Sequence, residues 1–172
     1  VVVLAMFNGI ASGAQPLISK FYAMNNKIGV RKILTLAMIS TAFVGVAVYV
    51  AAYSSASFIV GIFNSEHSAA MQTLAERGVK LYFIGSLFAG INIVTSTYFA
   101  AREKTMRAQT VSLARGFAFI LPAAFIMSKT LGTDGLWLSF PISELAVMIL
   151  SGALIMAEFS AERREEKKRL TA

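Results

Sequence analysis

Cysteine is absent from the 172-residue sequence, histidine occurs once, and charged residues make up only 15% of the chain. The lack of cysteine excludes disulfides, thiolate zinc sites and cysteine nucleophiles. Three prolines and twelve glycines are too few for a collagen-like chain or a proline-rich linker. Soluble domains usually carry about 25% charged residues. The low charge and the 56% hydrophobic content therefore indicate a protein that is dissolved in lipid.

Sequence motifs of common enzymes are also absent. The chain contains no GxxxxGK[ST] loop, no GxGxxG after a strand, no HExxH and no GxSxG. The lone histidine, His67, has no accompanying set of metal ligands. We therefore expect no enzyme activity, no cofactor and no metal site.

Long apolar runs dominate the sequence, and each approaches or exceeds the roughly 20 residues that a membrane-spanning helix needs. They predict an all-α, polytopic membrane helix bundle with five transmembrane helices. Residues 1–160 would form the membrane-embedded part, and residues 161–172 a charged tail. The predicted spans are residues 1–19, 33–63, 81–101, 108–127 and 135–159.

Basic residues are distributed unevenly around these spans. If the spans alternate in direction, residues 20–32, residues 102–107 and the tail carry twelve lysines and arginines on one side, against three on the other. Because basic residues mark the cytoplasmic side, this bias predicts a cytoplasmic C-terminus. The positive charge is thus a topology signal, with the lipid bilayer as partner and no nucleic acid. The tail is most simply a solvated helix end, and contact with anionic lipid is the weaker alternative.

The start of the chain has a consequence under this topology. Val1 would lie at the outer face and already belongs to an apolar run without a charged leader. An earlier span would be needed to bring it there. We therefore expect the chain to be the C-terminal part of a longer membrane protein.

Polar residues recur along one face of the first span. Asn8, Ser12, Gln15 and Ser19 follow helical spacing, and Pro16 is expected to bend this helix. Polar side chains in hydrocarbon face the bundle or a water-filled cavity. The stripe could therefore be a helix–helix contact or the lining of a transport path.

The later spans contain an amide and two opposite charges. Asn92 lies in the third span, Arg115 in the fourth and Glu144 in the fifth, and Pro122 and Pro141 are expected to bend the last two helices. At about 1.5 Å rise per residue, an arginine side chain can bridge the difference in depth between the two charges. We predict that Arg115 and Glu144 neutralise each other or share a wet cavity. Such a pair could fix packing or change partner during transport.

Four segments carry a resemblance to a known family. They are NGIASGAQPLISKFYAMNNKIGVRK (8–32), GINIVTSTYFAAREK (90–104), SLARGFAFILPAAFI (112–126) and GLWLSFPISELAVMI (135–149). In order and spacing they resemble the multidrug and toxic-compound extrusion (MATE) family, and look most like its DinF-like bacterial branch.

This resemblance implies the C-terminal lobe of a twelve-helix, two-lobe transporter in the bacterial inner membrane. It implies export of cationic or amphipathic small molecules in exchange for protons or sodium ions. The implied partner is an N-terminal lobe, without which the chain is expected to be inactive. The resemblance carries over Gln15, Asn92, Arg115 and Glu144 as cavity residues, to which the polar stripe adds Asn8.

Two other functions remain open. A lipid-linked oligosaccharide flippase has a related architecture, although several intramembrane cations would be expected and only Arg115 is present. The chain could also be a non-transporting membrane assembly subunit, whose polar stripes would be protein interfaces.

Overall fold

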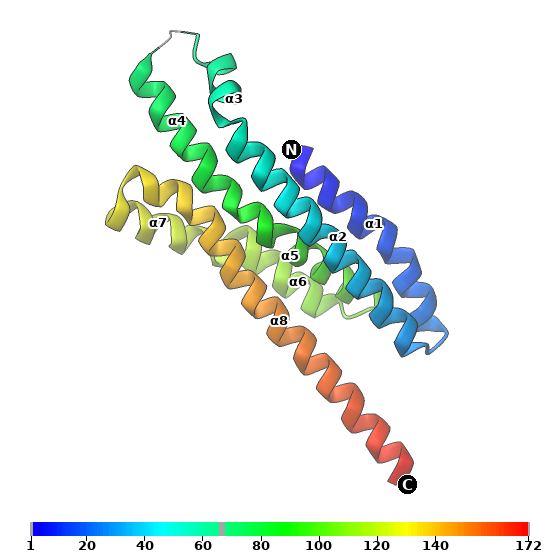
Figure 1. The fold of residues 1–172 in the computed structure, drawn as a ribbon. Helices are drawn as coiled ribbons and strands as arrows, with labels where there is room; N and C mark the ends of the chain where they lie inside the picture. Colours follow the sequence, from blue (N-terminus) through cyan, green and yellow to red (C-terminus); the bar gives the residue numbers. More distant parts are fainter. Residues whose placement is uncertain (1, 66–67, 172) are drawn as a thin grey trace.

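The computed structural model describes residues 2–65 and 68–171, and these residues are almost entirely helical (Figure 1). His67, the lone histidine, lies outside the described residues. The elements in order are α1 (Val2–Ala23), α2 (Lys27–Ser54), α3 (Ala56–Phe63), α4 (Ala69–Tyr82), a 3₁₀ turn η1 (Phe83–Gly85), α5 (Ser86–Ala101), α6 (Thr105–Leu113), a π-helical turn η2 (Ala114–Ala118), α7 (Ile120–Leu131) and α8 (Thr133–Thr171).

Five helical stretches of the described chain are long and apolar enough to cross a membrane. The predicted all-α bundle of five transmembrane helices is confirmed. The stretches are Val2–Ala23, Lys27–Ser54, Ala69–Ala101, Thr105–Leu131 and Thr133–Arg164.

Tight turns make several of these helices antiparallel neighbours. Asn25 between α1 and α2 has a φ of 53°, and Gly132 between α7 and α8 has a φ of 60°. Asparagine and glycine are the residues that adopt this left-handed region most readily. Asn26 then caps α2, because its side chain accepts a hydrogen bond from the Gly29 N–H at 2.8 Å.

The second predicted span differs from the observed helices. The apolar run 33–63 is divided between α2 and α3, with a break at Ser55, and α2 begins at Lys27. Beyond α3, the Asn64 amide donates hydrogen bonds to the Ser68 carbonyl and the Gln72 side chain, at 3.0 and 3.1 Å. These bonds join the end of α3 to the start of α4.

The core lies where α1, α2 and α5 meet. Phe7 and Ile18 of α1 and Tyr98 and Phe99 of α5 are fully buried there. Backbones approach closely at Gly45 of α2, whose carbonyl accepts a hydrogen bond from the Ser86 hydroxyl at 3.1 Å. A Cβ at this glycine would lie 2.7 Å from the Ser86 carbonyl oxygen. Small residues that permit such contacts are typical of membrane helix interfaces.

Large apolar side chains also cover the outside of the bundle. Phe43 of α2 is 76% exposed, and Phe58, Phe117 and Ile149 are similarly open. An aqueous surface of this kind would be unfavourable, whereas lipid chains solvate it well. The chain is therefore a multi-pass membrane protein.

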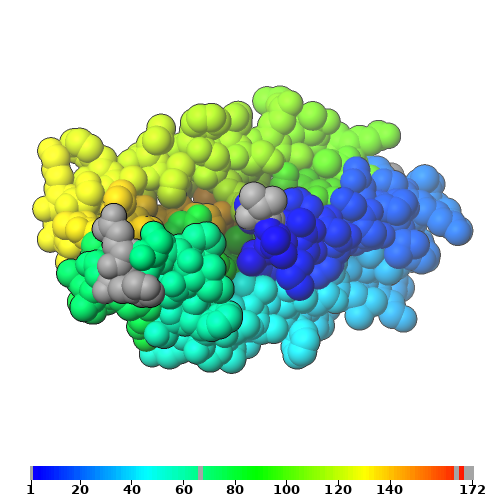
Figure 2. Space-filling view, turned by 90° about the horizontal axis from the view of Figure 1, so that it is seen from above, coloured from blue at the N-terminus to red at the C-terminus, as the bar shows by residue number. Residues whose placement is uncertain are grey.

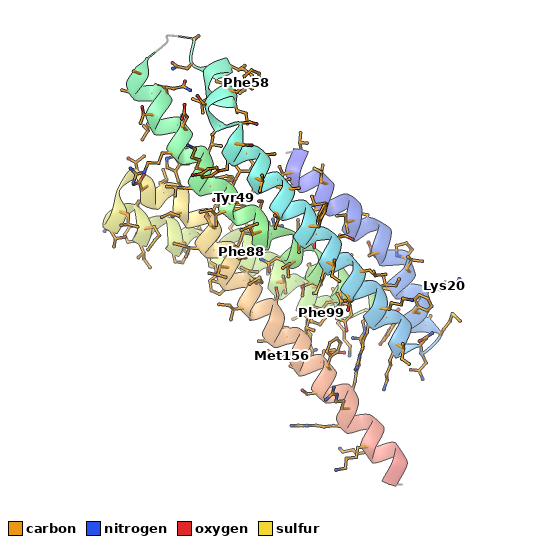
Figure 3. The ribbon with its side chains drawn as sticks, in the orientation of Figure 1. Lys20, Tyr49, Phe58, Phe88, Phe99 and Met156 are labelled. Carbon is orange, nitrogen blue, oxygen red and sulfur yellow. The ribbon has the colours of Figure 1, made fainter. Side chains whose placement is uncertain are left out.

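The last helix, α8, is 39 residues long and extends past the other helices (Figure 1). Seen from above, the α3–α4 end and the start of α1 lie on the same side of the molecule (Figure 2). Lys20, beside the α1–α2 turn, and Phe58 of α3 mark opposite ends of the bundle (Figure 3). The described chain therefore has one end at the α3–α4 turn and another, richer in charge, at the α1–α2 turn.

Candidate functional site

A cavity of about 460 Å³ opens between α1, α5, the α6–α7 segment and α8. Its polar lining is formed by Asn8, Asn92, Ser96, Thr97, Ser112, Arg115 and Glu144. Apolar side chains, among them Leu4, Ile93 and Phe140, complete the wall. The cavity therefore combines a hydrophobic surface with a few polar groups, as is usual for small-molecule sites.

Glu144 is the most deeply buried charge of this cavity, because its residue is only 2% exposed. The Arg115 Nε donates a hydrogen bond to Glu144 Oε1 at 2.6 Å. The Asn92 Nδ2 donates to Glu144 Oε2 at 2.8 Å and to the Glu144 carbonyl at 2.9 Å. Both carboxylate oxygens thus have a donor, as a buried charge requires.

Asn92 is held in turn by α8. The Ser151 hydroxyl donates a hydrogen bond to Asn92 Oδ1 at 3.2 Å. This contact fixes the orientation of the amide, so that its N–H groups face Glu144. Asn92 and Ser151 are both essentially inaccessible to solvent. The polar network therefore connects Asn92 of α5 to two positions on α8, Glu144 and Ser151, which lie about two helical turns apart.

Arg115 is placed by a local irregularity in its helix. Residues Ala114–Ala118 form a π-helical turn, in which the Phe119 N–H donates to the Ala114 carbonyl at 3.0 Å. Pro122 follows within the next turn and has no N–H to donate. Single π-turns occur frequently at functional sites, and this one contains Arg115 itself.

A pair of hydroxyl groups lies beside the ion pair. The Ser96 and Ser112 side chains are hydrogen-bonded at 2.9 Å, and Ser96 also donates to the Ala108 carbonyl at 3.2 Å. Ser112 precedes Arg115 by about one helical turn and lies on the same helix face. This spacing is the only sequence signal that places Ser112 beside the ion pair. The serines extend the polar wall from Glu144 toward α6.

The structure brings four of the five predicted cavity residues together: Asn8, Asn92, Arg115 and Glu144. Gln15 is exposed on α1 and does not line this cavity. The buried face of α1 is formed by Phe7, Ala11, Ala14 and Ile18, which are the neighbours of the polar stripe rather than its members. Of the stripe, Ser19 bonds to the Ala101 carbonyl at 3.0 Å, while Asn8, Ser12 and Gln15 are exposed.

The three prolines at which bends are predicted all lie within helices. Pro16 is inside α1 and Pro141 inside α8. Pro122 is in the first turn of α7, directly after the π-helical turn. Bending at Pro16, Pro122 and Pro141 stays a prediction.

The expected solvated tail needs a correction at Glu162. Its side chain is only 13% exposed and forms ion pairs with Arg31 and Arg102. Sequence reasoning also missed Glu158, which is buried against Arg102 and Arg107. Carboxylates spaced by one helical turn, at 158 and 162, were the available signal for a face directed at basic loops.

Among the described residues, no group of three or more histidine, cysteine, aspartate or glutamate side chains could hold a metal ion. The cavity instead offers one carboxylate, one guanidinium and several neutral hydrogen-bonding groups. This arrangement can exchange the partner of a buried charge without any covalent step.

A comparison with protein families connects this architecture to known proteins. The family model described as MatE matches residues 1–126, from α1 into α7. The chain belongs to the MatE family. MatE proteins are transporters rather than enzymes, and the five membrane-spanning helices fit that class. No curated protein and no solved structure matches the chain.

The MatE match includes Asn8, Asn92 and Arg115 but ends before Glu144. The ion pair therefore joins the matched part of the chain to α8, which lies outside it. Through this contact, α8 contributes Glu144 to the cavity of this MatE chain.

Proposed function

We propose that this MatE chain forms one lobe of a secondary transporter that exports cationic or amphipathic small molecules in exchange for protons or sodium ions. The observation that most directly supports this proposal is the buried Glu144 carboxylate at the cavity between α1, α5, α6–α7 and α8. Family membership supports the transport class. The substrate class and the coupled ion follow from the family resemblance.

The cavity offers a physical route for exchange. A cationic substrate or ion that reaches Glu144 would compete with Arg115 for the carboxylate. Because Asn92 holds the other carboxylate oxygen, Glu144 would remain oriented while its partner changes. Binding energy of this kind can shift the balance between two arrangements of the lobes only if it differs between them.

The open side of the cavity supports a two-lobed assembly. Asn8, Ser12 and Gln15 are exposed on α1, although exposed polar side chains are unfavourable in lipid. A second lobe facing α1 would place them at a central, hydrated cleft, as in transporters built from two repeats. On this proposal the C-terminus is cytoplasmic and the membrane is the bacterial inner membrane, as in the DinF-like branch.

The test uses proteoliposomes that contain this chain together with the second lobe. Efflux of a fluorescent organic cation is measured under a proton gradient and, separately, under a sodium gradient. Glu144→Gln keeps the shape of the side chain and should reduce efflux by about tenfold or more, since one charged contact is worth about 1.5–3 kcal/mol. Glu76→Gln is the matched control, because Glu76 lies on α4 and bonds to Gln72, away from the cavity.

Wild-type efflux by a well-folded Glu144→Gln protein would contradict this role. Translocation of a labelled lipid-linked oligosaccharide with no export of cations would favour the flippase. No transport under any gradient, combined with stable association with another membrane protein, would favour the assembly subunit.

A further inference from the structure

A second and larger cavity lies where the α1–α2 turn, the α5–α6 turn and α8 meet. Its volume is about 640 Å³, and we call it the basic pocket. Its acidic lining residues are Glu158 and Glu162. Its basic lining residues are Lys27, Arg31, Arg102, Lys104 and Arg107. The basic pocket therefore carries three more positive than negative side chains.

The two carboxylates are shared among several cations. Arg102 Nη2 lies 3.1 Å from Glu158 Oε1 and 2.5 Å from Glu162 Oε1. Arg107 also pairs with Glu158, and Arg31 lies 3.2 Å from Glu162. Each carboxylate is thus already bonded to more than one basic side chain. Even without Lys27, four basic side chains (Arg31, Arg102, Lys104 and Arg107) line the pocket with only these two carboxylates.

Two guanidinium groups in the basic pocket have an unused donor. The Nε atoms of Arg31 and Arg102 are buried and have no hydrogen-bond acceptor. Arg102 is the stronger case, because its side chain is only 6% exposed. Buried donors are nearly always paired, so an unpaired N–H on a lining residue indicates a place for an additional acceptor.

The backbone also favours an anion in this pocket. Its wall includes Asn25, Asn26, Lys27 and Ile28, and the 28-residue helix α2 begins at Lys27 with Asn26 as its N-cap. The N-terminus of a helix carries a partial positive charge that favours an anion, and it does so here although the Asn26 side chain already accepts the Gly29 N–H. Side chains and backbone therefore select the same kind of ligand.

The location of the pocket matches the edge of a membrane. It lies where the spanning helices α1 and α2 join and where the apolar part of α8 ends. Ile28, one of its wall residues, is 82% exposed, and the aromatic rings of Tyr22 and Phe159 are nearby. A headgroup could enter the pocket while its acyl chains remain against the apolar helices. Basic pockets of this kind between membrane helices bind phosphate-bearing headgroups.

We propose that the basic pocket binds a phosphate group, with Arg31, Arg102 and Arg107 as its principal ligands. The shared chemistry is a phosphate monoester or diester anion, carried by an anionic lipid or by a free phosphate compound. Arginine suits this ligand because its planar group donates two parallel hydrogen bonds. The pocket is separate from the Glu144 cavity, so the inference does not depend on the proposed transport.

The experiment measures binding to the full chain in neutral detergent by isothermal titration calorimetry. The probes are dihexanoyl phosphatidylglycerol, dihexanoyl phosphatidylcholine and inorganic phosphate. The test variant R31Q/R107Q removes two pocket cations whose side chains are only partly buried. The charge-matched control R77Q/K129Q removes two cations away from the basic pocket, Lys129 in the last turn of α7 and Arg77, which pairs with Asp134 at the start of α8. Circular dichroism melting verifies that all proteins are folded.

Phosphatidylglycerol should bind saturably to the wild type and the control, and at least about tenfold more weakly to R31Q/R107Q. Phosphatidylcholine, which has no net charge, should bind much more weakly. Competition by millimolar inorganic phosphate would identify free phosphate as a ligand source. Absence of that competition, with phosphatidylglycerol bound, would identify the lipid.

Glu162→Gln separates a phosphate site from a purely structural cluster. Removing this carboxylate takes one acidic partner from each of Arg31 and Arg102, while Arg102 keeps its ion pair with Glu158, and should tighten phosphatidylglycerol binding by about fivefold. A merely structural cluster would instead loosen, and binding would fall or stay the same. Equal affinity in R31Q/R107Q and R77Q/K129Q, or no saturable binding of either phosphate probe, would overturn the proposal.

Discussion

Replacement of Asn92 by alanine is the most direct test of the network around Glu144. The change removes the bond to the carboxylate, the bond to the Glu144 carbonyl and the bond from Ser151. A hydrogen bond to a charged group contributes about 2 kcal/mol. Each neutral bond between membrane helices contributes about 0.6 kcal/mol. We therefore expect the free energy of unfolding to fall by about 3 kcal/mol.

The assay is unfolding in dodecylmaltoside micelles by added sodium dodecyl sulfate, followed by circular dichroism and extrapolated linearly. Thr97→Ala is the control, because Thr97 lies on the same helix and lines the same cavity. It should change stability by less than about 0.5 kcal/mol. A loss below about 1 kcal/mol for Asn92→Ala, or equal losses for both variants, would refute the idea that this amide holds the buried carboxylate.

Three further predictions concern separate parts of the bundle. In a double-mutant cycle of Arg115→Met and Glu144→Gln, unfolding measurements should give a coupling free energy of about 2 kcal/mol, because the two side chains are in direct contact. Losses of stability that simply add would argue against the ion pair. Gly45→Leu should destabilise the bundle by at least about 2 kcal/mol, because a side chain there meets the Ser86 backbone. The control Gly9→Leu should be nearly neutral in the same unfolding assay, because the space around Gly9 is open. Asn26→Ala should cost about 1 kcal/mol through loss of the α2 cap, and Ser55→Ala, whose side chain makes no cap bond, should cost measurably less.

The transport proposal and the phosphate proposal concern different ends of one chain. Glu144 lies at the polar cavity, and Arg102 lies at the charged end beside α8. Variants at one site should therefore leave binding at the other unchanged. This independence lets each proposal be tested without the other.

Glu158 and Glu162 show where sequence reasoning was insufficient. A mixed-sign run such as residues 162–169 is most often solvated, and periodicity cannot show what a helix face meets beyond the membrane. The length of α8 and the positions of two tight turns bring both carboxylates to Arg102. Gln15 shows the opposite error, because it was predicted to line the cavity and does not. Helical spacing placed it on one stripe with Asn8 but could not show how far along α1 the cavity extends.

The sequence by itself determined the apolar surroundings, the helical class and the number of long apolar helices, although not where the second of them begins and ends. Long apolar runs have few alternatives to helices in lipid, because every backbone polar group must be bonded within its own segment. Only the tertiary structure decided which polar groups meet. The contact of Arg115 with Glu144 and Asn92 depends on a π-helical turn and on helix packing, and the cluster at Arg102 depends on where α8 crosses the turns. Such contacts join residues far apart in the chain, so they follow from the arrangement of helices in space and not from local spacing.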